Sequence, residues 1–237
     1  MKNKIYSGLR VLKNDGLIRL LNILIEIYFR YWYVERHGLS FNNNKISIKE
    51  LNKKVGSARY ESFGVEYGFS QFKWMISGVN SLPIKVKNSV ILDIGSGEGL
   101  PLCYFAQKGF KKVMGIEFSG DLVKTSRTNL KLIEDKYNNF QWDIIEGDAY
   151  NYQIPDEVNV IWMFNPFYGD LLEKVLMNIQ NAGQKRKIFI LFANPPKETL
   201  TKKYLLLIKK IRPTYPRLFL YTTDTNLYKD AFIEKYN

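Results

Sequence analysis

Short apolar runs alternate with longer amphipathic stretches over most of the chain, from residue 90 to residue 222. The runs lack the every-second-residue pattern of a half-exposed strand, so they predict strands that are buried on both faces. These strands are expected at residues 90–94, 112–117, 143–146, 159–164, 187–192 and 218–222. The stretches between them have the spacing of helices, at residues 100–108, 120–137, 170–181 and 197–211. Strands that alternate with helices predict an α/β fold with a doubly wound, mostly parallel sheet, which binds ligands at the carboxyl ends of its strands.

The first 88 residues lack this alternation and predict a mostly helical extension, so the expected division of the chain is 1–88 and 89–237. Within the extension, residues 17–33 predict a helix that is apolar almost all round. Its polar side chains are spaced by three, four and four residues and form one narrow stripe, at Arg19, Asn22, Glu26 and Arg30.

The apolar surface of such a helix must be shielded from water, and two ways of shielding it are possible. One is packing against the main domain together with a neighbouring helix or a second subunit, and the other is shallow insertion into a membrane surface. No run reaches the ~18 apolar residues of a membrane-spanning helix, and no small-residue cleavage site indicates a signal peptide.

The charge of the chain is concentrated at its two ends. There are 35 Lys and Arg against 23 Asp and Glu, a formal charge of +12. Residues 1–60 carry 12 basic and 4 acidic side chains, residues 61–184 carry 11 and 15, and residues 185–237 carry 12 and 4. This distribution suits an anionic partner such as a phosphorylated metabolite, a membrane or a nucleic acid. The excess of Lys over Arg, 26 to 9, is equally typical of an AT-rich genome, so both explanations stay open.

Cysteine and histidine each occur once, as Cys103 and His37. One of each excludes an internal disulfide and a His-rich metal site, so no metal is expected. Cys103 falls in a predicted helix among apolar residues, which favours a core position over a nucleophile. The expected setting is a reducing cytoplasm.

The first predicted strand ends in the segment Asp93-Ile94-Gly95-Ser96-Gly97-Glu98-Gly99. Glycines at such a turn allow positive φ angles and close approach of the backbone to a ligand. The third glycine comes one position too early for a dinucleotide loop. The loop also starts with a carboxylate, which suits a cationic ligand better than a pyrophosphate.

Residues 90–99 resemble the cofactor loop of class I S-adenosylmethionine-dependent methyltransferases, and the resemblance extends from about residue 89 to residue 192. It implies a seven-stranded Rossmann-like sheet, with residues 1–88 as a cap on the acceptor side. It also implies S-adenosyl-L-methionine as cofactor, with its methionine part held by Asp93, Gly95, Ser96 and Gly97.

The resemblance extends to the next two strand ends. Glu117 ends the second strand, where a carboxylate can accept both ribose hydroxyls. Phe118 could pack on the adenine. Asp148, which precedes Ala149 after the third strand, matches the position that accepts from the adenine amino group.

The fourth strand leads into Asn165-Pro166-Phe167-Tyr168, which is similar to the Asn-Pro-Pro-Tyr motif of amino-group methyltransferases except that Phe167 replaces the second proline. The resemblance makes Asn165 and Tyr168 the candidate catalytic residues, with Asn165 also bordering the cofactor. Tyr60, in a Tyr-rich segment before the domain, is a further candidate for cofactor contact. Candidates for a general base, where the acceptor needs one, are Tyr168, Glu61, Glu66 and Asp170.

These observations predict a methyltransferase that acts on an N or O atom of a polar or anionic acceptor. The favoured acceptor is a small molecule or a glycan- or lipid-linked molecule. The alternatives are a protein (lysine) or nucleic-acid N-methyltransferase and a non-catalytic cofactor-binding interaction protein. The helix at 17–33 would provide peripheral membrane contact or a homodimer interface. The expected location is cytoplasmic, including the membrane periphery.

Overall fold

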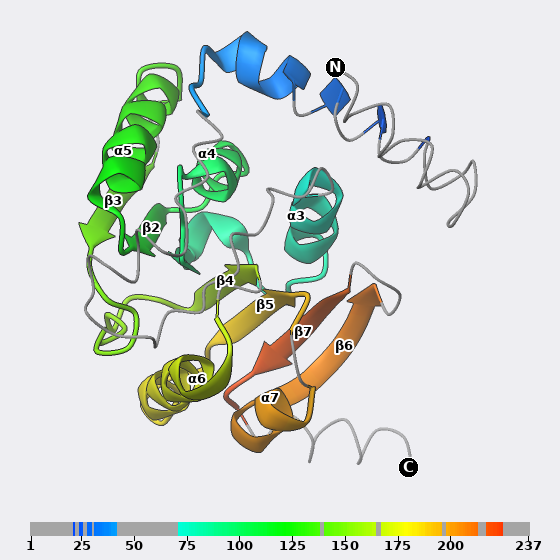
Figure 1. Ribbon diagram of the computed structural model, residues 1–237. Helices are drawn as coiled ribbons and strands as arrows, with labels where there is room; N and C mark the ends of the chain where they lie inside the picture. Colours follow the sequence, from blue (N-terminus) through cyan, green and yellow to red (C-terminus); the bar gives the residue numbers. More distant parts are fainter. Residues whose placement is uncertain are drawn as a thin grey trace, which may run out of the picture.

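A single sheet of seven strands forms the centre of the computed structural model (Figure 1). The structure describes residues 21, 24, 25, 28, 29, 31–41, 71–137, 140–164, 167–195, 198–212 and 217–224. The strands are β1 (Val90–Ile94), β2 (Lys112–Glu117), β3 (Gln141–Glu146), β4 (Val160–Phe164), β5 (Phe189–Ala193), β6 (Leu206–Arg212) and β7 (Leu218–Thr222). Their order is β3-β2-β1-β4-β5-β7-β6, and β7 runs antiparallel to β5 and β6 while the other pairings are parallel. The predicted doubly wound, mostly parallel Rossmann-like sheet is therefore confirmed.

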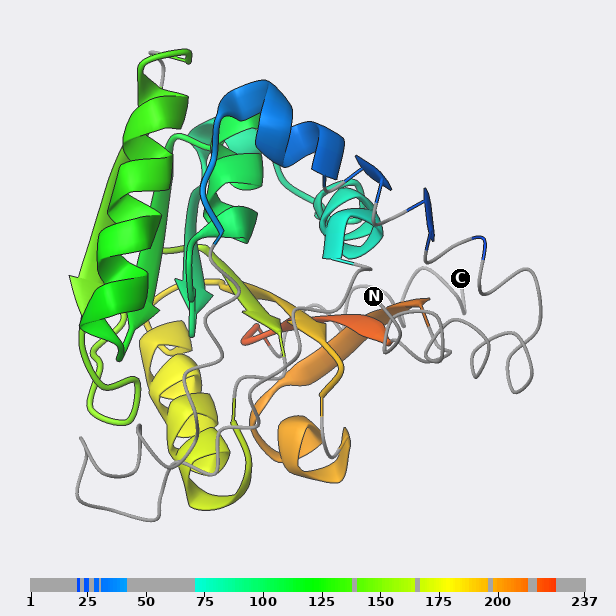
Figure 2. The same cartoon turned by 45° about the horizontal axis from the view of Figure 1, so that its top comes forward.

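Helices cover both faces of the sheet, as Figures 1 and 2 show. One face carries α3 (Gln71–Val79), α4 (Leu100–Gln107) and α5 (Gly120–Glu134), and the other carries α6 (Gly169–Gly183) and α7 (Glu198–Tyr204). A short 3-10 helix, Val86–Asn88, leads into β1. Because both faces are covered, β1, β5 and β7 are buried at every position. This burial explains the continuous apolar runs of these strands. The expected burial on both faces is wrong for β3, which lies at the edge of the sheet and is exposed at Gln141, Asp143 and Glu146.

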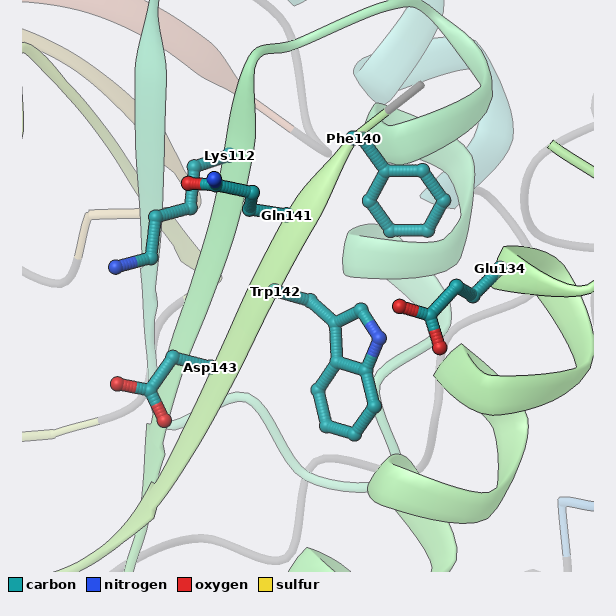
Figure 3. Close-up of a pocket in the computed structure, with 6 residues that line it drawn as sticks. All are labelled: Lys112, Glu134, Phe140, Gln141, Trp142 and Asp143. Atoms are coloured by element: carbon teal, nitrogen blue, oxygen red, sulfur yellow. The ribbon is translucent and has the colours of Figure 1, made fainter. Parts of the chain in front are cut away.

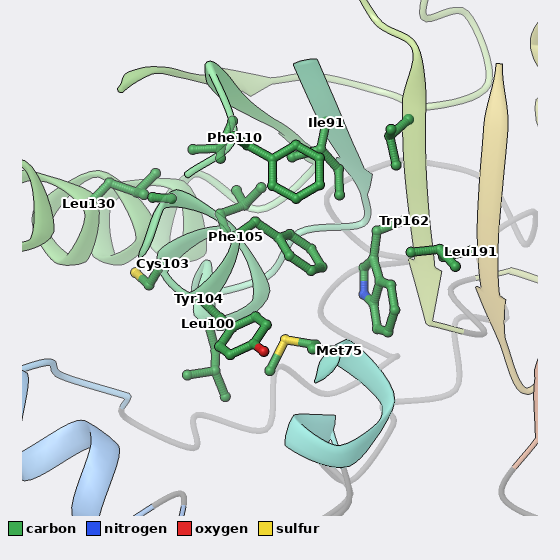
Figure 4. Packing of buried hydrophobic residues seen from close by; sticks show 14 of the residues in the cluster. Met75, Ile91, Leu100, Cys103, Tyr104, Phe105, Phe110, Leu130, Trp162 and Leu191 are labelled. Atoms are coloured by element: carbon green, nitrogen blue, oxygen red, sulfur yellow. The ribbon is translucent and has the colours of Figure 1, made fainter. Parts of the chain in front are cut away.

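Aromatic side chains fill the core between the sheet and α4 (Figure 4). The ring of Phe105 on α4 lies 5.7 Å from Phe110 and 5.5 Å from Trp162 of β4, both in edge-to-face arrangements. Each fully buried side chain of this kind contributes about 1.5–3 kcal/mol. Cys103 lies in the same cluster and is fully buried, as expected of a core residue, and burial raises the pKa of its thiol well above the usual range.

The helix expected over residues 197–211 is wrong beyond residue 204. There α7 ends, and residues 206–212 form the edge strand β6, which pairs with β7 from Leu206↔Thr222 to Arg212↔Leu218. The other elements predicted from residue 90 onward match to within three residues at each end. The helix predicted at residues 17–33 continues to His37, and its start lies outside the described residues.

Residues 31–41 and α3 pack on the main domain. Tyr33 lies 4.9 Å from Phe72 of α3, which in turn lies 5.9 Å from Tyr104 of α4, measured between ring centroids. His37 is buried beside Tyr33, and its Nδ1 lies 2.9 Å from the Tyr33 carbonyl oxygen. These residues belong to the same apolar cluster as α4 and β1. The boundary at residue 88 stays a prediction.

The helical residues before Tyr33 are exposed instead. The described apolar side chains between residues 21 and 32 are 44–65% exposed, so the main domain does not cover them. A second subunit or a membrane surface stays open as the covering. Within the described ranges, the helices are too short or too polar to cross a bilayer.

Candidate functional site

The turn between β1 and α4 has the backbone that its glycines predict. Gly95, Gly97 and Gly99 have φ angles of 79°, 55° and 82°, values that favour glycine. The N–H groups of Gly95 and Ser96 both donate to the carbonyl oxygen of Ile116, at 2.9 and 3.1 Å. The loop therefore lies across the carboxyl end of β2.

Glu117, the last residue of β2, joins this loop through its carboxylate. One oxygen, Oε2, accepts a hydrogen bond from Gly97 N–H at 2.9 Å, and Oε1 accepts one from Ser119 N–H at 3.0 Å. A carboxylate has about four acceptor positions. The two hydrogen bonds leave acceptor capacity for ligand groups such as vicinal hydroxyls, so the carboxylate can position the loop and bind a ligand at once.

Asp93 lies next to Glu117 and is almost completely buried, with 2% of its surface exposed. Burial raises its pKa well above the ordinary value of 3.8, and the negative charge of Glu117 raises it further. Burial also raises the pKa of Glu117, although the N–H groups of Ser119, Gly97 and Phe118 counteract the shift. A cationic ligand would offset the cost of holding two carboxylates together. The donor set thus fits a ligand that carries an ammonium or sulfonium group.

Ser96 adds a second indication of a polar ligand. Its hydroxyl is buried and has no hydrogen-bond partner among the described residues, which is uncommon for a buried polar atom. The hydroxyl fits close to β2 because residue 115 is glycine: a Cβ there would lie 2.6 Å from Ser96 Oγ.

The third predicted carboxylate, Asp148, lies two residues beyond the end of β3. Its Oδ1 accepts a hydrogen bond from Tyr150 N–H at 2.8 Å, and the preceding Gly147 N–H donates to the Glu117 carbonyl oxygen at 3.0 Å. Phe118 and Ala149 are half-buried at the same edge. The predicted cofactor residues of β1, β2 and β3 therefore come together at the carboxyl ends of three adjacent strands, while their individual roles stay predictions.

β4 lies beside β1 on the side opposite β2, so its carboxyl end borders the same edge of the sheet. Asp93 and Trp162 are register partners of β1 and β4, the two strands between which the connections reverse direction. Ligands of doubly wound sheets bind at this switch point. Phe164 ends β4 with its ring 4.9 Å from that of Trp74 on α3. Tyr168 is half-buried at the start of α6.

Several predicted site residues lie outside the described residues: Tyr60, Glu61, Glu66 and Asn165. Asp170, also a candidate base, is exposed in the first turn of α6. The structure thus leaves the catalytic assignment of Asn165 and Tyr168, and the choice of base, as predictions.

Asn194, the first residue of the segment Asn194-Pro195-Pro196 after β5, forms a turn. It has a φ of 50°, its N–H donates to the Arg217 carbonyl oxygen at 2.8 Å, and its Oδ1 accepts from Arg217 N–H at 2.7 Å. These bonds fix the start of β7 beside the end of β5.

Asn129 is a site residue that the sequence did not reveal. It is fully buried on α5; its Oδ1 accepts from Ser40 N–H at 2.9 Å, and its Nδ2 donates to the carbonyl oxygens of Ser40 and Glu98 at 2.8 and 3.1 Å. One amide thus joins the N-terminal extension to the candidate cofactor loop. The available signal was an amide on the inward face of a helix, between the buried residues Ser126 and Ile133.

A hollow of about 500 Å³ lies elsewhere, at the amino ends of β2 and β3 (Figure 3). It is lined by Lys112, Glu134, Phe140, Gln141, Trp142 and Asp143. Since Lys112 and Gln141 begin their strands, this hollow is at the opposite end of the sheet from the candidate site. Among the described side chains, no group of three or more His, Cys, Asp or Glu is placed to hold a metal ion.

Comparison with known proteins identifies the central part of the chain. The model of a family described as a methyltransferase domain matches residues 91–182, the stretch that contains the glycine loop and the three carboxylates. Residues 91–182 therefore match a methyltransferase domain.

Individual proteins are similar to parts of the chain. A candidate N5-glutamine protein methyltransferase of Methanocaldococcus jannaschii is 35% identical over 85 residues, which are 36% of this chain and 40% of that protein. The chain therefore matches less than half the length of this relative. A Haemophilus influenzae protein described as a candidate methylase superposes with a TM-score of 0.50 at 18% identity, over 63% of this chain and 87% of its own. An RNA methyltransferase from Salinibacter ruber, solved with S-adenosyl-L-homocysteine, has a TM-score of 0.45 at 19% identity, over 59% and 83%.

Proposed function

We propose that the protein is an S-adenosylmethionine-dependent methyltransferase that methylates a nitrogen or oxygen atom of a polar or anionic acceptor. The favoured acceptor is a small molecule or a glycan- or lipid-linked molecule. The observation that carries this proposal is the pair formed by the buried Asp93 and the half-buried Glu117 beneath the glycine loop of a methyltransferase domain. Two adjacent acids with raised pKa values are costly without a cation, and this cofactor is cationic at two places.

Each residue of the edge would have a definite task toward S-adenosyl-L-methionine. Asp93 would face its ammonium group, and Glu117 would accept from the ribose hydroxyls with the acceptor positions that Gly97 and Ser119 leave open. Asp148 and Phe118 would contact the adenine. The bound cofactor supplies a methyl group on a positively charged sulfur, which is released as a neutral thioether.

On the acceptor side, the chain positions the reacting atom and controls its proton. Asn165 would accept a hydrogen bond from an acceptor N–H or O–H, and Tyr168 would flank it. Alignment of two reactants supplies a large part of the acceleration in reactions of this kind. A base is needed only where the acceptor is a hydroxyl or a protonated amine.

Methylation of a protein amide is the second candidate. The similarity to a candidate N5-glutamine protein methyltransferase favours it, and so does the segment Asn165-Pro166-Phe167-Tyr168. An amide nitrogen is neutral at physiological pH, so Asn165 would bind its N–H groups directly. The replacement of the second proline by Phe167 keeps this candidate behind the first.

Calorimetry with S-adenosyl-L-homocysteine tests the cofactor site. We expect binding by the wild type and at least about tenfold weaker binding by Glu117→Gln, because one charged acceptor is lost. The control is Asp143→Asn, which removes an exposed carboxylate at the hollow of Figure 3 and should leave affinity unchanged. No binding by the wild type, or equal binding by both variants, would contradict the proposal.

The acceptor class is tested with S-adenosyl-L-methionine that carries a tritiated methyl group, incubated with the protein and a cell extract. The extract is then separated into small-molecule, lipid, protein and nucleic-acid fractions. Label in the first two supports the proposed acceptor, and label in protein that hydrolysis releases as N5-methylglutamine supports the second candidate. Glu117→Gln is the control for label that does not depend on this site.

A further inference from the structure

One face of the N-terminal helix is apolar and exposed. Its described members, here called the apolar face, are 44–65% exposed: Leu21, Leu24, Ile25, Tyr28, Phe29, Tyr31 and Trp32. Positions 21, 25, 28 and 32 follow the four-three-four spacing of a single helical stripe. Monomeric proteins seldom leave so many large apolar side chains side by side in water. The apolar face therefore indicates a contact surface.

The next turn of the same helix fixes the direction in which the apolar face points. Tyr33 and His37 are buried against α3 and the main domain, and Lys136 donates from its Nζ to the Arg36 carbonyl oxygen at 3.3 Å. The helix is thus anchored by the opposite side of its last turns. In Figure 2 the helical turns at residues 31–37 run along the outside of the molecule, and the exposure of the apolar face shows that the main domain does not cover it.

Positive charge lies at one end of the apolar face. The guanidinium of Arg36 lies 5.1 Å from the ring centre of Trp32, directly beside the exposed aromatic side chains. Lys136 adjoins the same turn, which also carries one exposed acid, Glu35. The first 60 residues carry 12 basic and 4 acidic side chains. A partner that covers the apolar face must therefore tolerate, or require, a high density of positive charge.

We propose that the apolar face docks on a bilayer surface that contains anionic phospholipids. Leucine and isoleucine side chains would enter the acyl boundary, and Tyr28, Tyr31 and Trp32 suit the headgroup level because they combine an apolar ring with a polar atom. Each Lys or Arg near an anionic surface adds about 1 kcal/mol of attraction, which salt screens. A second copy of the chain is the less favourable occupant, because pairing two apolar faces brings two basic ends together.

Vesicle flotation of the full chain tests this docking. We expect binding to phosphatidylcholine vesicles that contain phosphatidylglycerol, weak binding to phosphatidylcholine alone, and loss of binding at high salt. Ile25→Asp should reduce binding by about tenfold or more, because a carboxylate would enter the apolar boundary beside anionic lipid. The matched control is Met177→Asp on α6, since Met177 is exposed to 39% and Ile25 to 44%, both on helices. Binding of S-adenosyl-L-homocysteine by both variants shows separately whether the folded domain is intact.

Tryptophan fluorescence gives a second measurement on the same samples. Of the four tryptophans, Trp74 and Trp162 are buried and Trp142 is half-buried, so a blue shift on adding anionic vesicles should come from Trp32. Trp32→Phe should abolish the shift and retain flotation. Failure to float, or equal binding to neutral vesicles at all salt concentrations, would overturn the proposal. A dimer in light scattering that becomes a monomer in Ile25→Asp, without vesicle binding by the wild type, would assign the apolar face to a second copy.

Discussion

The carboxylates of Asp93 and Glu117 illustrate how a binding site lowers the stability of the protein that contains it. Their pKa values are raised because both are buried, and the pKa of Asp93 is raised further by its neighbour. The folded state therefore holds the Asp93 proton to a higher pH than the unfolded chain does. It follows that the contribution of Asp93 to stability is full below its ordinary pKa of 3.8 and is lost as pH rises through the raised value.

Replacing Asp93 by asparagine should separate stability from binding. In Asp93→Asn we expect a higher free energy of unfolding than in the wild type near neutral pH, and a flatter dependence on pH above the ordinary aspartate pKa of 3.8. Affinity for S-adenosyl-L-homocysteine should fall by about tenfold or more. Urea denaturation over the pH range and calorimetry measure the two effects. A less stable variant with unchanged affinity would show that Asp93 serves the fold only.

Asn129 has a structural effect that reaches two segments at once. Asn129→Ala leaves Ser40 N–H and two carbonyl oxygens without their partner, so we expect a loss of about 1–3 kcal/mol in the free energy of unfolding. Amide hydrogen exchange should accelerate at Leu39 and Ser40. The neighbouring Thr128→Ala is the control, because its exposed hydroxyl donates only to the Lys124 carbonyl oxygen. Equal stability of the two variants would contradict the linkage.

The three carboxylates could be predicted from the sequence and the role of Asn129 could not, because only the carboxylates are marked by local sequence features. Asp93, Glu117 and Asp148 could be predicted because they follow recognisable strands at positions where the chain resembles a known family, and parallel strands bring their carboxyl ends to one edge. The partner of Asn129, Ser40, is 89 residues away and has no sequence feature that pairs it with an amide. Contacts of this kind depend on the assembled fold.

At the level of elements, the turn into α4 depends on Gly99 for two reasons. Its φ is 82°, and a Cβ at this position would lie 2.3 Å from Ser126 Oγ on α5. Gly109, which follows the other end of α4, has nearly the same φ, 83°, but nothing within 4 Å of its Cβ position. The two glycines therefore separate backbone strain from steric overlap.

We expect Gly109→Ala to cost about 1–2 kcal/mol, the strain of a left-handed residue that carries a Cβ. Gly99→Ala should cost clearly more, because α5 has to move as well. Thermal unfolding measures both, and Ser126→Ala in the Gly99→Ala background should recover part of the difference. Equal costs at the two glycines would show that the loop can shift without strain.

The correctly predicted strands and the wrong prediction of a helix beyond residue 204 show how far local sequence pattern determines secondary structure. A run such as Val90–Ile94 is buried on both faces, and its continuous apolar character is specific enough to predict. Residues 205–211 contain apolar side chains that fit helical spacing as well as strand spacing. The decision comes from β7, which supplies backbone partners to β6 from a later part of the chain.

For the whole molecule, the shared core predicts one unfolding transition. Tyr33, Leu39 and Phe72 of the extension belong to the same apolar cluster as β1, β4 and α4. We expect tryptophan fluorescence, dominated by the buried Trp74 and Trp162, and far-ultraviolet circular dichroism to report the same midpoint in urea. Two separated transitions would show that the extension is an independent folding unit.

Part of the positive charge of the chain lies on the edge strand β6, where it can have a role that involves no ligand. Its middle residues, Ile208, Lys209 and Lys210, are exposed where the sheet ends. An open sheet edge offers unpaired N–H and C=O groups to which a strand of another molecule can add. Such an addition would have to accommodate the charged side chains of Lys209 and Lys210, so we expect these lysines to oppose edge-to-edge aggregation.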